Sequence, residues 1–123
     1  MGVNLLFVNV VRWRVSKENS KKQFEFMRWW MDWQRSHPEK LYYTKSRLFT
    51  STEEESPEEN WMFLDEYEQR EDFDKQMKAA HEDPELAKVI NDECFPRWDP
   101  LIVPGSKRKG EAWTELEELR VEL

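Results

Sequence analysis

The segment WMFLDEYEQREDFDKQMKAAHEDPELAKVINDEC, residues 61–94, decides the fold. It begins with the alternation of an extended chain, in which every second side chain points to the same side. One side carries Trp61, Phe63, Asp65 and Tyr67, and the other carries Met62 and Leu64. Both sides are apolar in the first half, so this strand requires cover on both faces.

The second part of the segment changes to a helical period. Apolar residues recur at spacings of four and three, as on one face of a helix: Phe73, Met77 and Ala80. Asp83 and Pro84 then predict the start of another helix, because aspartate caps helices and proline suits the first helical position. Its apolar stripe continues to Cys94, and Pro96 is expected to end it.

The residues before this segment predict a strand, a helix and a second strand. The first strand spans 3–15, and the helix runs from about Ser20 to Arg35, ahead of His37-Pro38. Ser20 and Gln23 match a capping box, with Ser16 as the alternative cap. The second strand spans 41–51, and an acidic loop, TEEESPEEN, spans 52–60.

The residues after it are less regular. We expect an extended chain over Arg97–Pro104 and a basic turn, GSKRKG, over 105–110. The apolar residues of 111–123 fit either a helix or a strand end. We favour a strand, because the order then becomes β-α-β-β-α-β, the ferredoxin-like α+β arrangement. It predicts a four-stranded antiparallel sheet with helices on one face.

Composition limits the classes of function. The chain has 123 residues and predicts one domain over 1–123, with a net charge of −7 that argues against nucleic acid and anionic membranes as partners. No stretch has a signal-peptide pattern or the ~20 apolar residues of a membrane span, so we expect a cytoplasmic protein. The single cysteine, Cys94, excludes an intrachain disulfide and fits a buried position.

Two helices cover only one face of a four-stranded sheet, yet the first and third strands are apolar on both faces. Apolar patches of that size are uncommon on soluble monomers. We therefore expect a homodimer through the sheet face, with ~800 Å² buried on each partner.

The element order and the stretch FLDEYEQREDFDKQMKAAHEDPELAKV, residues 63–89, resemble the dimeric α+β barrel superfamily. Its members include antibiotic-biosynthesis monooxygenase domains and stress-responsive A/B barrel proteins, and the resemblance covers residues 3–121. It implies a dimeric barrel with a ligand pocket between helix and sheet, but fold alone does not select a function. Haem-degrading members carry an Asn on the first strand, and Asn9 matches it by position. They also carry a Trp on the second helix, but residues 71–97 contain no Trp. We expect no cofactor.

Four residues are candidates for catalysis: Asn9, Asp65, Tyr67 and His81. A carboxylate among aromatic rings would have a raised pKa and could accept a proton. If the second and third strands pair, Arg47 could share a face with Asp65. The alternative to a catalytic acid is then a salt-bridged pair or a solvated strand end. Asn9 could equally be a satisfied strand residue or a dimer contact, and His81 a surface residue at a helix end.

The candidate ligand-binding residues are mostly aromatic: Trp13, Met27, Trp30, Trp33, Tyr43, Arg47, Trp61 and Phe63. The alternative is that the tryptophans form the core. His37, His81 and Cys94 have no metal-ligand spacing, so we expect no metal site. The hypothesis is a homodimer that binds a small apolar or aromatic molecule; the alternative is a cofactor-free monooxygenase or isomerase.

Overall fold

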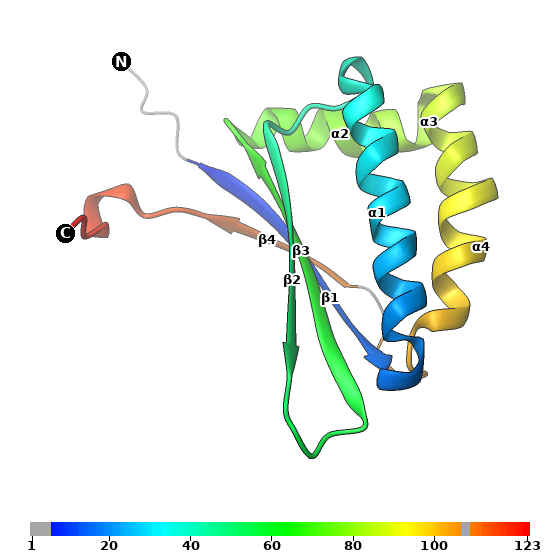
Figure 1. Cartoon of the computed structure of the whole chain (residues 1–123). Helices are drawn as coiled ribbons and strands as arrows, with labels where there is room; N and C mark the ends of the chain where they lie inside the picture. Colours follow the sequence, from blue (N-terminus) through cyan, green and yellow to red (C-terminus); the bar gives the residue numbers. More distant parts are fainter. Residues whose placement is uncertain (1–5, 107–108) are drawn as a thin grey trace.

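A computed structural model of the chain describes residues 6–106 and 109–123. The sheet is antiparallel with strand order β2-β3-β1-β4. Its strands are β1 (Phe7–Ser16), β2 (Lys45–Thr52), β3 (Glu58–Tyr67) and β4 (Lys109–Thr114). The helices are α1 (Ser20–Ser36), α2 (Arg70–Glu82), α3 (Pro84–Val89) and α4 (Phe95–Trp98), with a π-helical turn, η3 (Ile90–Cys94), between the last two. All of them lie on one face of the sheet (Figure 1), which confirms the predicted ferredoxin-like arrangement.

The pairing of β1 with β3 sets which side chains lie under the helices. Phe7 lies opposite Tyr67 and Trp13 lies opposite Trp61. The side chains of these four residues therefore lie on the same face of the sheet. The core forms where this face meets α1, η3 and α4: Val11, Trp13, Val15, Phe26, Met27, Trp61, Cys94 and Trp98. The Trp13 ring packs edge-on against Trp98, with centroids 4.8 Å apart.

Within residues 6–106 and 109–123, no helix covers the other side of the sheet (Figure 1). This open face carries apolar side chains from all four strands: Val8, Val10, Phe49, Met62, Leu64 and Trp113. Val10 is buried, and the others are half-buried or exposed. Charged residues also lie on it, including an ion pair between Arg12 and Glu111 at 2.8 Å.

The predicted capping box at the start of α1 is wrong. Asn19 is the N-cap residue, and no side chain caps the helix. Gln23 is fully buried and points into the core, where its Oε1 accepts a hydrogen bond of 3.3 Å from Trp13 Nε1. The indole N–H of a buried tryptophan needs an acceptor, and this need overrides the local capping pattern.

The prediction that Pro96 ends a helix is also wrong, and the predicted extended chain begins only at Ile102, which forms an antiparallel bridge with Val15. The Phe95 N–H bonds to the Ile90 carbonyl across the π turn, and Pro96 then occupies the first turn of α4, where its missing N–H is not needed. The chain stays helical through Trp98 and a 3-10 turn at Asp99–Leu101. This brings the Trp98 side chain into the core rather than leaving it on an extended segment.

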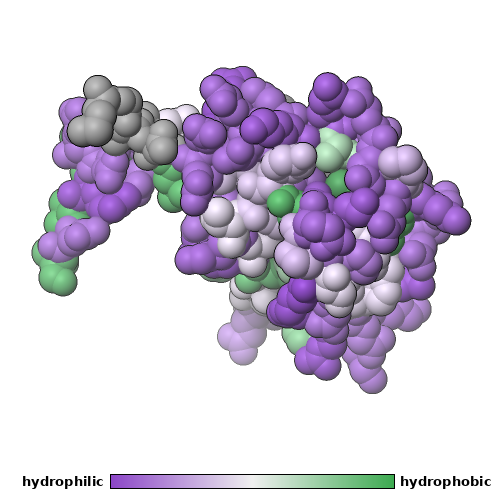
Figure 2. Space-filling view, turned by 90° about the horizontal axis from the view of Figure 1, so that it is seen from above, coloured by the Kyte–Doolittle hydropathy of each residue, from purple (hydrophilic) through white to green (hydrophobic). Residues whose placement is uncertain are grey.

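The C-terminal strand is confirmed only in part. β4 ends at Thr114, opposite Phe7, and one more bond joins the Glu115 N–H to the Leu6 carbonyl. Residues beyond it leave the body of the protein (Figure 1), and their apolar side chains are exposed: Leu116, Leu119, Val121 and Leu123. Most of the surface seen in Figure 2 is hydrophilic, with small hydrophobic areas between the hydrophilic residues.

Parts of two predicted elements, residues 3–5 of the first strand and 107–108 of the basic turn, lie outside the described residues. The acidic loop is shorter than predicted, because β2 continues to Thr52 and β3 already begins at Glu58. Within the described part of the chain, no helix is both long and apolar enough to cross a membrane.

Candidate functional site

A cavity of about 170 Å³ lies between the sheet and the helices. Its walls are mainly rings and other apolar side chains from α1, β3 and the α3–α4 region, among them Phe26, Met27, Trp30, Phe63, Ile90 and Trp98. Seven polar side chains also line it: Asn9, Gln34, Tyr43, Ser46, Asp65, Tyr67 and Gln76. A mostly apolar cavity with a few convergent polar groups is the usual form of a small-molecule site.

The polar floor of the cavity is a row of residues across the sheet. Ser46 on β2 lies opposite Asp65 on β3, which lies opposite Asn9 on β1. Directly paired residues share a face, so all three point toward the helices. A Cβ atom on Gly110 of β4 would lie 3.3 Å from Asn9 Oδ1, so the glycine leaves room for the Asn9 amide.

Asp65 is the buried acid of the cavity, with a relative exposure of 8%. Burial disfavours its charged form and raises its pKa to about 7, while a hydrogen bond from Ser46 acts in the opposite direction. Its Oδ1 atom has no hydrogen-bond partner within residues 6–106 and 109–123. Asp65 therefore offers a free acceptor inside an apolar cavity and titrates near neutral pH.

Two tyrosines stand beside this acid. Tyr67 is fully buried, and its hydroxyl likewise lacks a partner among the residues that the structure describes. The Tyr43 hydroxyl donates to Gln34 Oε1. Burial, and secondly the charge of Asp65, raise the pKa of both phenols, so both are neutral at physiological pH. Their rings meet nearly at right angles, with centroids 5.7 Å apart.

The cavity gathers seven of the residues that the sequence singled out: Asn9, Asp65, Tyr67, Met27, Trp30, Tyr43 and Phe63. The others lie elsewhere. Trp13 and Trp61 belong to the core, and Trp33 stacks on His37 at 4.0 Å. His81 is exposed on α2 and does not line the cavity.

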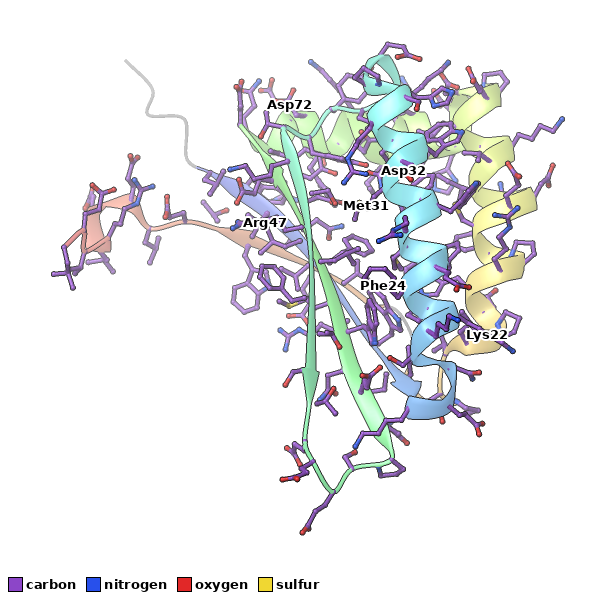
Figure 3. All side chains as sticks on the ribbon, in the orientation of Figure 1. Lys22, Phe24, Met31, Asp32, Arg47 and Asp72 are labelled. Atoms are coloured by element: carbon purple, nitrogen blue, oxygen red, sulfur yellow. The ribbon has the colours of Figure 1, made fainter. Side chains whose placement is uncertain are left out.

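The expectation that Arg47 shares a face with Asp65 is wrong. Arg47 lies opposite Leu64 and so points to the open face, where it forms an ion pair with Glu66. Figure 3 shows Arg47 on the side of the sheet away from α1, whereas Met31 lies between α1 and the sheet. No lysine, arginine or histidine of the described residues lines the cavity.

Sequence reasoning missed two glutamines that line the cavity. Gln34 extends the α1 stripe of Phe26 and Trp30 by one further turn, and Gln76 lies within the α2 stripe. Both are buried, and Gln76 Oε1 accepts a 2.6 Å hydrogen bond from the Tyr42 N–H. The sequence did contain a signal for both glutamines, because each is a polar residue at a position where the helical stripe is otherwise apolar.

Among the described residues, no group of three or more His, Cys, Asp or Glu side chains could hold a metal ion. The cavity therefore offers one carboxylic acid, two neutral phenols, three amides, a serine hydroxyl and the Cys94 thiol for chemistry.

Comparison with known proteins supports the fold. No protein-family profile matches the chain, and no curated protein matches it. Among solved structures, it is similar to a NIPSNAP family protein of unknown function from Agrobacterium tumefaciens, with a TM-score of 0.61, 10% identity and coverage of 93% of this chain and 91% of the other.

Two further structures match the families that the sequence resembles. A candidate antibiotic biosynthesis monooxygenase from Nitrosomonas europaea has a TM-score of 0.55, 15% identity and 94% coverage of both chains. A dabb family protein with a ferredoxin-like fold from Mesorhizobium loti has a TM-score of 0.54, 12% identity and coverage of 91% and 97%. These likenesses confirm the fold that the resemblance implies.

Replacing Asp65 by Asn should stabilise the free protein at neutral pH. The pKa of Asp65 is raised from 3.8 to about 7 on folding, so the native state binds more protons between these values. The free energy of unfolding of the wild type therefore falls as the pH rises from about 4 to about 7, by roughly 4 kcal/mol at most. We expect Asp65→Asn to be more stable than the wild type by about 2–4 kcal/mol at pH 8 and equal to it near pH 4.

Urea unfolding of both proteins from pH 4 to pH 8 measures this difference. Glu66→Gln changes the neighbouring carboxylate on the open face and is the control that should keep the wild-type pH dependence. Parallel pH profiles for the wild type and Asp65→Asn would show that Asp65 is not buried as a high-pKa acid.

Proposed function

We propose that the protein binds a small apolar or aromatic molecule in the cavity between the sheet and the helices. The observation that carries the proposal is the pair of buried polar atoms, Asp65 Oδ1 and the Tyr67 hydroxyl, that lack partners among the described residues. A buried polar group without a partner costs about 1–3 kcal/mol, so such groups are uncommon unless they serve a ligand or bound water.

The size of the cavity supports a ligand with a single ring. Its volume of about 170 Å³ is close to the ~150 Å³ of an engineered apolar cavity that takes up benzene. Rigid rings form much of the wall, so the cavity is largely preformed and little ordering is needed on binding.

Filling the cavity should abolish binding. Ala80 lines the cavity from α2, whereas Ala79 beside it does not. We expect Ala80→Phe to weaken binding of single-ring compounds by tenfold or more, because the new ring takes their place, and Ala79→Phe to leave it unchanged. A tenfold change corresponds to about 1.4 kcal/mol.

Two-dimensional ¹H–¹⁵N NMR with toluene, benzyl alcohol and benzylamine provides the measurement. The indole signals of Trp30 and Trp98, which line the cavity, should shift on binding, while that of Trp113 on the open face should not. Unchanged indole signals with all three compounds would reject the proposed function.

The alternative function is that of a cofactor-free monooxygenase or isomerase. One support is that Asn9, Asp65 and Tyr67 line the same cavity. A second is the pKa of Asp65, near 7, which suits a group that accepts and returns a proton. His81, exposed outside the cavity, has no part in this alternative.

An enzyme of this kind should lose turnover in Asn9→Ala and in Asp65→Asn while both variants keep their fold and still bind ligand. The measurement is product formation from each bound compound in air, with circular dichroism as the check on folding. Full turnover in both variants would remove these residues from the mechanism, and absence of product from the wild type would leave a binding protein.

We further propose that two copies associate through the open face. Its apolar centre would be covered by the same face of a partner, and some of its charges already form ion pairs within the chain, Arg12 with Glu111 and Arg47 with Glu66. A specific interface of ~800 Å² per partner fits a sheet face of this kind.

A charge on the open face should separate the two copies. Trp113 on β4 and Phe24 on α1 have the same exposure, 54%, but only Trp113 lies on the open face. We expect Trp113→Glu to give a monomer and Phe24→Glu to stay dimeric, as measured by light scattering on dilution. A wild type with the 15.1 kDa mass of one chain would contradict the dimer.

A further inference from the structure

Among the described residues, the cavity is lined by one carboxylic acid and by no lysine, arginine or histidine. Asp65 and Tyr67 from β3, Tyr43 from the segment before β2 and Cys94 from η3 are the titratable groups that line it, and α1, α2 and β1 contribute none. The nearby cations of β2, Lys45 and Arg47, lie on the open face with Glu66. The described part of the chain therefore supplies no counterion for an ionised Asp65.

A buried carboxylate without a counterion is costly, and a bound cation would remove that cost. Asp65 already has one hydrogen bond from Ser46, and its Oδ1 remains as the acceptor in the cavity. The neutral Tyr67 hydroxyl, two residues along β3 on the same face, offers a second acceptor. An ammonium group has three donors and no acceptor, which suits this pair of oxygen atoms.

The walls of the cavity also favour a cation. Tyr43 and Tyr67 meet at 88°, and Trp30, Phe63 and Trp98 also line the cavity. Aromatic faces attract ammonium groups, and this attraction is largest where the cation is desolvated. A carboxylate within an aromatic enclosure therefore selects a cation with an apolar body over a neutral or anionic molecule.

We propose that the ligand of this cavity is a small primary amine, whose ammonium group bonds to Asp65 and Tyr67 while its apolar body packs against the aromatic walls. This inference rests on the proposed binding function and names the class of ligand. The volume of about 170 Å³ limits the body to about one ring, so benzylamine is a suitable probe.

The pH dependence of binding follows from the same contact. Burial raises the pKa of free Asp65 to about 7, so below this pH the carboxyl must release a proton before it can pair with an ammonium ion. The ligand itself stays protonated from pH 6 to pH 8. Affinity for the amine should therefore fall about tenfold between pH 8 and pH 6, with proton release at the lower pH.

Titration calorimetry of the full chain with benzylamine, benzyl alcohol and toluene tests the proposal. We expect benzylamine to bind at least tenfold more tightly than benzyl alcohol at pH 8, and most of this preference to disappear at pH 6. Buffers with different heats of ionisation measure the released proton. Asp65→Asn should lose the preference but still bind benzyl alcohol, whereas Glu66→Gln, the control for general attraction to an acidic protein, should keep it.

Two failures can be told apart. Equal or tighter binding of benzyl alcohol or toluene by the wild type at pH 8 would overturn the amine proposal and leave the cavity as a site for neutral molecules. Absence of binding by all three probes would overturn the proposed function together with it. The pH dependence of the wild type needs no variant, so the proposal stays testable even if Asp65→Asn does not fold.

Discussion

The antiparallel register of β1 against β3 is the constraint on which the rest of the structure depends. It pairs Asn9 with Asp65 and Trp13 with Trp61, and so places two buried polar residues and the core tryptophans on one face. Side chains alternate along each strand, so a slip of one residue would turn this whole set to the open face. The core, the cavity and the open face all follow from this single alignment.

The sequence predicted these two strands well because alternation is a local property. The α3 cap was predictable for the same reason, and the Asp83 side chain does accept the Leu86 N–H at 3.0 Å. The position of Arg47 was not predictable, because it depends on how many residues the hairpin between β2 and β3 leaves unpaired. Thr52 pairs with Glu59, and this sets the side of the sheet to which every β2 residue points.

The helical path through Pro96 was hidden for a different reason. Proline ends a regular α-helix because it lacks an N–H, but one π turn before it changes the bonding pattern and lets the helix continue. The consequence reaches the candidate site. Trp98, expected on an extended segment, instead lines the same cavity as Asp65 and adds an aromatic ring to its wall.

Asp65 and Glu66 show how one strand gives two neighbouring carboxylates opposite roles. Glu66 points to the open face and lies against Arg47 and Lys45, so its charge is balanced within the chain. Asp65 points to the helices, and no cation of the described residues lines its cavity. Burial therefore disfavours the charged form of Asp65, and proteins commonly retain a cost in stability where a residue serves binding or catalysis. The imbalance between these adjacent acids is therefore the strongest reason to place the function in the cavity.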